Sequence, residues 1–490
     1  MQLHHSEPLG WNPMLPPQQA KAVKRSAFTL LNVIKNVFLI AVLFFLNKLG
    51  TTGSVLGYLV LFTMAARSTE GAIKAMSLGA LYIIANPYLV SINLAHTFLR
   101  FPLIAVAGAR IFWDARRLAP RMFAQGHLHA LLIFGGVSLV CAFVNQYFFM
   151  ISFLKLSVFT YGAYAIMLGT DLQRTSGSDL TAWFSAIILF FILGNLLAYA
   201  TGVGYTFRGK LLEEGGKLGF AGMTNHPQTQ GPLAAISAIY AFCVYLFTPY
   251  RMRWLMALAV PVLLVMCYMS AARTGLFAVA LAMGMILWIT FFMSGGVKRF
   301  RLNISPVQII IIILFGISGI ILLEAFTGGA ISGRFGDFAL KAIRGDTAGG
   351  LSFANVFASR IPLIEVSMAN FKQSPFTGIG FGTMLDAGWA ANANLFTAPT
   401  EKGFLPTAVL EETGILGAAC FVLFILIFLR KYWKKRNIVA IGLMVCFLLL
   451  NFGEMMFFSL GGMGLYCWSI LGAGISLGDQ VVKKYPNFFG

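Results

Sequence analysis

Long apolar runs separated by short polar segments make up most of this chain of 490 residues. A helix needs about 20 apolar residues, with a range of about 17 to 25, to cross the hydrocarbon core of a bilayer. Measured against that length, the pattern predicts about 14 membrane-spanning helices, each placed to within a few residues at its ends. They are expected near residues 28–46, 52–66, 76–94, 96–112, 129–148, 150–170, 180–200, 227–247, 254–270, 275–293, 306–326, 406–429, 438–457 and 462–478.

The composition supports the same fold class. Hydrophobic residues make up 58% of the chain and charged residues 11%, and the mean hydropathy is +0.80. A soluble domain carries about 25% charged residues, so this chain has too few to solvate a globular surface. We therefore predict an all-α polytopic membrane protein. The six cysteines fall inside apolar runs without a CxxC pair, so neither a disulfide framework nor a thiolate metal site is indicated. We predict no cofactor and no metal ligand.

Basic residues give the predicted orientation. The formal net charge of +19 is spread over short loops between apolar runs, which is the positive-inside pattern and not that of a nucleic-acid-binding patch. With the N-terminus inside, the inner loops hold Arg67, Lys74, Arg110, Arg116, Arg117, Arg121, Arg251, Arg253, Lys298, Arg299, Arg301, Arg430, Lys431, Lys434, Lys435, Arg436, Lys483 and Lys484. Both termini are therefore predicted to be cytoplasmic. The polar start of the chain lacks the apolar stretch that a cleaved signal peptide needs.

The chain divides into five predicted parts. These are a cytoplasmic segment (1–26), an N-terminal transmembrane bundle (27–200), core spans with outer polar elements (201–326), a large periplasmic loop (327–405), and C-terminal spans with a cytoplasmic tail (406–490). Loops as long as the fourth part are usually functional or disordered. Within it, residues 354–372 carry an apolar stripe at helical spacing, which predicts an amphipathic helix at the outer membrane surface. Pro375 and a glycine run are expected to end that helix.

Two short polar clusters lie at the outer ends of predicted spans. The first, 222–231, includes Asn225 and His226 at the start of the eighth span. Asn225 is suited to cap that helix, and a helix N-terminus that faces a water-filled cavity also attracts anions. The second, 270–275, contains Arg273. This arginine either extends its charged group to the membrane interface or faces a cavity, where it can pair with an anionic ligand.

The large loop and the span that follows it carry further candidates. Arg360 projects from the predicted amphipathic helix, and a turn containing Gly378 and Gly380 follows. Such a turn can bind phosphate, although the need for positive φ explains the same glycines. Glu401 and Glu412 lie at the mouth of the next span, where a carboxylate can transfer protons or only cap the helix.

The order of these elements is similar to that of a known family. An outer Asn-His-Pro cluster leads one span, a Ser-x-x-Arg-Thr-Gly turn follows two spans on, and a long outer loop comes last. That loop contains SRIPLIEVSMANFKQSPFTGIGFGT and is followed by AVLEETGILGA. Between about residues 200 and 425 the chain resembles the O-antigen ligase and Wzy-type polysaccharide polymerase superfamily of bacterial envelopes.

The resemblance implies an inverting, metal-independent glycosyltransferase of the bacterial inner membrane. Its donor would be an oligosaccharide on undecaprenyl diphosphate, used on the periplasmic face. By position, the resemblance assigns Arg273, Arg360 and Lys217 (alternatively Arg208) to the diphosphate, and Asn225, Gly378 and Gly380 to loops that face the substrate. The partners it implies are that lipid-linked oligosaccharide, membrane lipids, a chain-length regulator and a flippase.

One departure from the family pattern, a missing histidine, bears on whether the chain is a ligase or a polymerase. The ligases carry a histidine in a His-Asn pair shortly before the Glu-x-Gly element, where this chain has Glu401 and no histidine. Either Glu401 or His226 is the base, with Glu412 a further candidate for proton transfer, or the chain is not a lipid A ligase. We favour a polymerase that joins repeat units into an exopolysaccharide, capsule or O-antigen. The alternatives are a ligase that transfers glycan to lipid A or protein, and a polysaccharide transporter or flippase. A transporter usually keeps its polar residues near mid-membrane, unlike this chain.

Overall fold

A computed structural model of the chain describes residues 29–91, 93–116, 125–145, 148–176, 180–207, 210–211, 213–214, 217–248, 253–270, 272–290, 360–385, 402–459 and 462–484. In this part of the chain, seven helices are long and apolar enough to cross a membrane, and three shorter helices are also apolar. The predicted helical membrane protein is therefore confirmed. The full number of spans stays a prediction, and the span expected near 306–326 lies outside the described residues.

Where it is described, the N-terminal half consists of helices. They are α2 (Leu30–Lys48), α3 (Thr51–Arg67), α4 (Thr69–Ile84), α5 (Leu94–Ala115), α6 (Gly126–Asn145), α7 (Phe149–Ser176) and α8 (Thr181–Ala200). Side-chain caps fix where some of them begin, because the first N–H groups of a helix have no partner inside it. The Gly71 N–H donates to Ser68 Oγ at 3.0 Å, and the Ala95 N–H donates to Asn93 Oδ1 at 3.0 Å.

The C-terminal half begins with a short irregular segment and is otherwise helical where it is described. Its elements are η2 (Val203–Tyr205), β1 (Thr206–Phe207), β2 (Lys210–Leu211), β3 (Glu213–Glu214), β4 (Lys217–Leu218), α9 (Pro227–Phe247), α10 (Arg253–Met269), α11 (Arg273–Trp288), α15 (Ile361–Gln373), α17 (Leu405–Lys434), α18 (Ile438–Leu450) and α19 (Met463–Lys484). The strands form two antiparallel hairpins, β1 with β2 and β3 with β4. The hairpins hold eight residues of extended backbone in a polar segment between helices, and the described structure is otherwise helical, as the all-α prediction expects.

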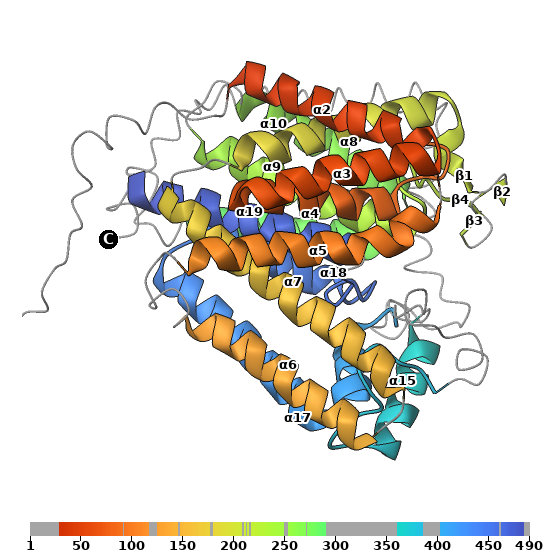
Figure 1. Cartoon of the computed structure of the whole chain (residues 1–490), viewed down its shortest axis with the longest axis vertical. Helices are drawn as coiled ribbons and strands as arrows, with labels where there is room; N and C mark the ends of the chain where they lie inside the picture. Colours follow the sequence, from red (N-terminus) through yellow and green to blue (C-terminus); the bar gives the residue numbers. More distant parts are fainter. Residues whose placement is uncertain are drawn as a thin grey trace, which may run out of the picture.

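Figure 1 shows a large bundle with a smaller helix pair beside it. Nearly every residue of α9, α18 and α19 whose side chain is described is buried, so these helices form the centre of the bundle. Helices α6 and α17 run side by side away from that centre, and α7 packs on both α6 and α5. Helix α15 packs on α17 near one end of this pair. The described part of the large loop therefore rests on α17.

Two helices end earlier than the hydrophobic pattern predicts. Helix α4 ends at Ile84 rather than near residue 94, because Asn86 bonds through its backbone to Met223 O (2.7 Å) and through its side chain to Gly222 O (3.2 Å). Helix α18 ends at Leu450 rather than near residue 457. There Asn451 Oδ1 accepts the N–H groups of Met456 (2.9 Å) and Phe457 (2.8 Å). Asparagine side chains thus replace helical hydrogen bonds within apolar sequence.

The predicted amphipathic helix is present in part. Residues 361–373 form α15, which ends two residues before Pro375 as the sequence indicates, and the residues from 354 to 359 lie outside the described part. Leu363 and Val366 are exposed on α15 while Ser367 is buried against the protein. The helix therefore presents an apolar surface away from its support.

Candidate functional site

The site is built around a kink in α17. Gly414 has φ 63° and ψ −170°, which interrupts the helix. Two carbonyl groups freed before the kink accept from the loop after α15: Glu411 O from the Ile379 N–H (2.8 Å) and Glu412 O from the Gly380 N–H (3.1 Å). After the kink, the Ile415 N–H donates to the carbonyl of the loop residue at position 375 (2.9 Å). The loop thus replaces the hydrogen bonds that the kink breaks.

The glycine turn is part of this same junction. Gly378 has φ 68° and Gly380 has φ 112°, as the positive-φ interpretation of the turn requires. A Cβ on Gly378 would lie 2.5 Å from the carbonyl carbon of Glu412, so the two segments are in close contact. The Gly378 N–H donates to Ser374 O at 2.8 Å, and the next two N–H groups donate to α17. These donors are used within the protein in this structure, and a substrate-binding role for Gly378 and Gly380 stays a prediction.

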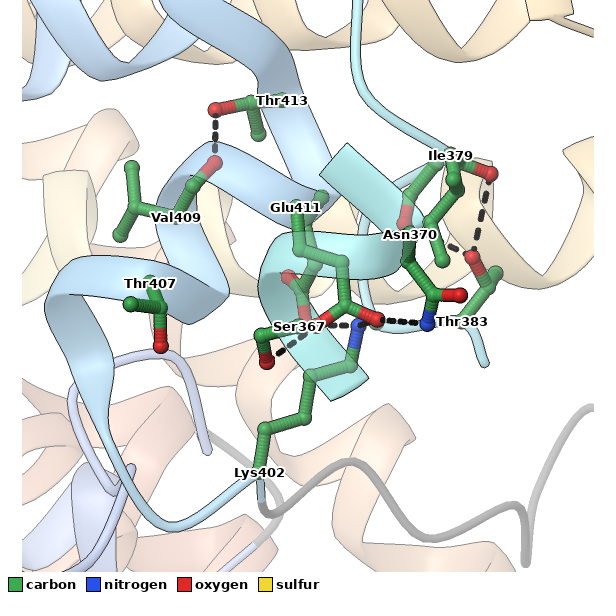
Figure 2. A network of polar contacts seen from close by, with 12 residues as sticks. Ser367, Asn370, Ile379, Thr383, Lys402, Thr407, Val409, Glu411 and Thr413 are labelled. Carbon is green, nitrogen blue, oxygen red and sulfur yellow. Dashed lines mark hydrogen bonds and ion pairs between the residues drawn. The ribbon is translucent and has the colours of Figure 1, made fainter. Parts of the chain in front are cut away.

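Buried charges lie beneath the turn, and Figure 2 shows their contacts. The Glu411 carboxylate accepts from Ser367 Oγ (2.7 Å) and Asn370 Nδ2 (2.7 Å) of α15, and Lys402 Nζ lies 3.1 Å away. Lys402 Nζ also lies 3.4 Å from Glu412 Oε1. The side chains of all three charged residues are at most 2% exposed. Buried charges are tolerated only when paired, so this cluster holds α15 against α17.

Glu412 is therefore enclosed. Its side chain is fully buried beside Lys402, and α7 contributes Lys155 nearby, which donates through Nζ to Gly382 O at 2.9 Å. A carboxylate in this position does not reach a sugar hydroxyl in the described structure, because other side chains cover it. Its role in proton transfer stays a prediction.

Arg360, which directly precedes α15, pairs with a carboxylate from the far end of the chain. Its Nη2 lies 2.7 Å from Glu454 Oε1, and the two side chains are 22% and 17% exposed. Glu454 belongs to the turn after α18 that Asn451 organises. Gly403 lies on another side of the guanidinium, since a Cβ there would be 2.7 Å from Arg360 Nη1. Arg360 is thus a partly accessible cation with a carboxylate already bound to it.

The segment that contains Arg273 contacts the turn of Glu454 through the next residue, Thr274. Arg273 is the first residue of α11 and is exposed. The next residue, Thr274, packs against Gly453, where a Cβ would lie 2.7 Å from the Thr274 Cβ. Gly231 of α9 in turn packs against the side chain of Ser270 in the turn before α11. The start of α9, the turn before α11 and the Glu454 turn therefore lie side by side.

His226 and not Asn225 caps α9, which corrects the capping prediction. The Gln228 N–H donates to His226 Nδ1 at 3.2 Å. Asn225 uses its backbone N–H to donate to Ile84 O at 2.8 Å, and its buried Oδ1 has no hydrogen-bond partner among the described residues. The extended backbone of His226 places its ring over the first N–H groups of the helix, which is the N-cap position. Its use as a base stays a prediction.

The remaining candidates are not joined to this cluster by the described contacts. Lys217 lies in β4 opposite Glu214, and nothing is described of its side chain. Arg208 and Glu401 lie outside the described residues. In the part of the chain that the structure describes, no group of three or more His, Cys, Asp or Glu side chains is placed to hold a metal ion.

Sequence reasoning missed Asn145, Lys402 and Glu454. Asn145 at the end of α6 accepts through Oδ1 from Ser374 Oγ (3.1 Å) and donates to Thr377 Oγ1 (2.9 Å), which anchors the turn after α15. Both Asn145 and Glu454 fall within runs predicted as spans, so their polarity was averaged into apolar windows. A polar residue in the last turn of such a run is the signal that could have found them.

Comparisons with known proteins add no assignment. No protein-family model and no curated protein sequence matches the chain. The relation to the polymerase and ligase superfamily stays a prediction from the sequence motifs.

Proposed function

We propose that this chain is an inverting, metal-independent glycosyltransferase that joins undecaprenyl-diphosphate-linked oligosaccharide repeat units into a polysaccharide. It acts on the periplasmic face of the inner membrane, and its product is an exopolysaccharide, capsule or O-antigen. The observation that carries the proposal is the meeting of Arg360 and the Arg273 segment at one turn, residues 451–454. The order of motifs along the sequence supports the same activity.

The chemistry requires cations at the leaving group. The acceptor hydroxyl oxygen attacks the anomeric carbon, the bond from that carbon to the diphosphate oxygen breaks, and the electron pair stays on the diphosphate. Arg360 and Arg273 stabilise the charge that develops there, since guanidinium groups bind phosphate oxygens in bidentate geometry and keep their proton. The hydroxyl proton passes to a base on the opposite face of the sugar, for which His226 and Glu401 are the candidates.

The test is an assay with the purified full-length protein in liposomes, a lipid-diphosphate-linked repeat unit and no divalent metal. We expect a ladder of longer lipid-linked glycans. Arg360→Ala and Arg273→Ala should each reduce the rate by at least about 100-fold, because each removes a donor aimed at developing charge. Lys372→Ala is the matched control and should keep the wild-type rate. Lys372 is an exposed cation on α15, and no described contact joins it to Arg360, Glu454 or the buried charges around Lys402.

Three outcomes contradict the proposal in different ways. Transfer of a finished glycan to lipid A or protein without a ladder indicates a ligase. Movement of the same lipid across a sealed vesicle without new glycosidic bonds indicates a flippase. A normal ladder from either arginine variant removes that arginine from the diphosphate site.

A further inference from the structure

The ion pair between Arg360 and Glu454 has a geometry that suits exchange. Among the described residues, the pair is joined through Nη2 and Oε1 at 2.7 Å, whereas a guanidinium offers five N–H donors in a planar fork. Both side chains keep about a fifth of their surface exposed, so solvent and solutes reach them. Carboxylate and phosphate oxygens bind a guanidinium in the same way. A diphosphate oxygen is therefore a direct competitor for the position of Glu454.

We propose that Glu454 is an internal competitor for the diphosphate-binding position on Arg360, which the diphosphate of the lipid-linked donor takes by displacing it. This inference rests on the proposed function. It names the ligand class of the site, a diphosphate dianion, and a residue that sets how tightly the ligand is held. Glu454 returns to Arg360 when the lipid diphosphate leaves, which keeps the product from remaining bound.

Hydrogen bonds hold the backbone around Glu454, so the proposed exchange is a movement of its side chain. Asn451 Oδ1 accepts two backbone N–H groups of the turn, and Asn451 O accepts the Leu405 N–H at 2.9 Å. Gly453 packs against Thr274 on the other side. On the arginine, Gly403 offers no side chain beside Nη1, where a Cβ would lie at 2.7 Å. The second arm of the guanidinium fork is therefore not covered by a side chain at position 403.

The same geometry argues against Glu454 as the base. In an inverting transfer the acceptor attacks from the face opposite the leaving group, and in inverting glycosidases the two acting carboxyl groups are about 6.5–9.5 Å apart. Glu454 lies 2.7 Å from an arginine assigned to the leaving group, so it is on the leaving-group side. It acts through Arg360 and is a positioning residue.

The experiment measures the binding of inorganic pyrophosphate to full-length protein in nanodiscs by calorimetry. Glu454→Gln should bind about tenfold more tightly than wild type, since a charged competitor for Arg360 is removed. Arg360→Gln and the double variant should both lose this binding. In the liposome assay, Glu454→Gln should lower KM for the donor and also lower kcat, because the product leaves more slowly.

Asp114→Asn is the matched control. It removes another partly exposed arginine–carboxylate pair, Arg110 Nη2 to Asp114 Oδ1 at 2.9 Å in α5, and should leave pyrophosphate affinity unchanged. If Glu454→Gln does not fold, Glu454→Asp replaces it. The shorter side chain holds Arg360 less well, so affinity should rise about twofold.

Two results overturn the inference. One is an affinity of the Glu454 variant at or below that of wild type, which is what a purely structural ion pair gives. The other is equal pyrophosphate binding by wild type and Arg360→Gln. A wild-type protein that makes no glycan ladder overturns the proposed function instead, whereas a ladder combined with either of these two results removes only the role of Glu454.

Discussion

Lys402 lies between two carboxylates that solvent does not reach. Replacing it with methionine keeps most of the side-chain volume but leaves Glu411 and Glu412 without the cation that lies 3.1 and 3.4 Å from them. Removing one partner of a buried ion pair typically costs about 3–5 kcal/mol. We therefore expect Lys402→Met to lower the unfolding temperature of the detergent-solubilised protein strongly, measured by intrinsic fluorescence. Lys372→Met, on the exposed face of α15, should leave it unchanged.

A second substitution tests the electrostatic origin of that loss. Glu412→Gln in the Lys402→Met background removes one uncompensated charge, while Glu411 keeps its bonds to Ser367 and Asn370. The double variant should regain a large part of the lost stability, because paired residues couple in a double-mutant cycle. Equal unfolding temperatures for the single and the double variant would mean that packing, and not charge, explains the effect.

The sequence identified Arg360 but not its partner Glu454. Arg273 and Arg360 are recognisable from the sequence because a cation beside apolar runs is costly unless it has a role. The partner of Arg360, Glu454, is 94 positions away in the sequence and lies within a run that the hydropathy pattern predicts as a span. Hydropathy averages over many residues, so a single acid at the end of a helix does not change the result. Partner identity depends on packing, which the local pattern does not encode.

The kink in α17 is the element that holds the site together. Its φ of 63° and ψ of −170° belong to a region that is nearly exclusive to glycine, with a cost of about 1–3 kcal/mol for other residues. A Cβ at Gly414 would also lie 2.5 Å from Thr377 N and closer to the Phe376 carbonyl. Gly414→Ala should therefore destabilise the protein and separate the turn after α15 from α17. We expect a lower unfolding temperature together with faster proteolysis within residues 374–382.

Gly284→Ala is the control for that variant. Gly284 lies in α11, and a Cβ there would have nothing within 4 Å. Alanine is favoured over glycine in a helix by up to about 1 kcal/mol, so this variant should be as stable as wild type or slightly more stable. If Gly414→Ala behaves like Gly284→Ala, the kink does not depend on glycine at that position.

The sequence predicted that these helices exist, but it did not always predict the residues at which they end. Apolar length alone located α6, α8 and α9 to within three residues at their described ends. It failed where an asparagine in apolar sequence bonds to backbone, as Asn86 and Asn451 do. Such bonds depend on a second segment or a tight turn being in place. Capping patterns therefore predict possible ends, and tertiary contacts select among them.

For the whole molecule, alternation of spans predicted which connections share a side. That alternation stays a prediction, since two contacts that join connections, from the Asn86 N–H to Met223 O (2.7 Å) and from the Leu405 N–H to Asn451 O (2.9 Å), involve asparagines that were predicted to lie inside spans. Which helices pack together could not be predicted. Helix α17 pairs with α6, far from it in sequence. Lipid-facing and protein-facing residues are both apolar in a membrane protein, so hydropathy does not distinguish one neighbour from another.

The side of the membrane that holds the site decides whether the proposed donor is possible. The positive-inside pattern predicts that Lys434 is cytoplasmic and that α15, with Gln373, is outside. Both side chains are exposed, whereas the native cysteines are buried or half-buried, so background labelling should be low. A membrane-impermeant maleimide added to intact spheroplasts should label Gln373→Cys, and should label Lys434→Cys only after permeabilisation, with wild type as the control. The reverse pattern would put Arg360 and Glu454 on the cytoplasmic face, and a donor presented in the periplasm could then not reach them.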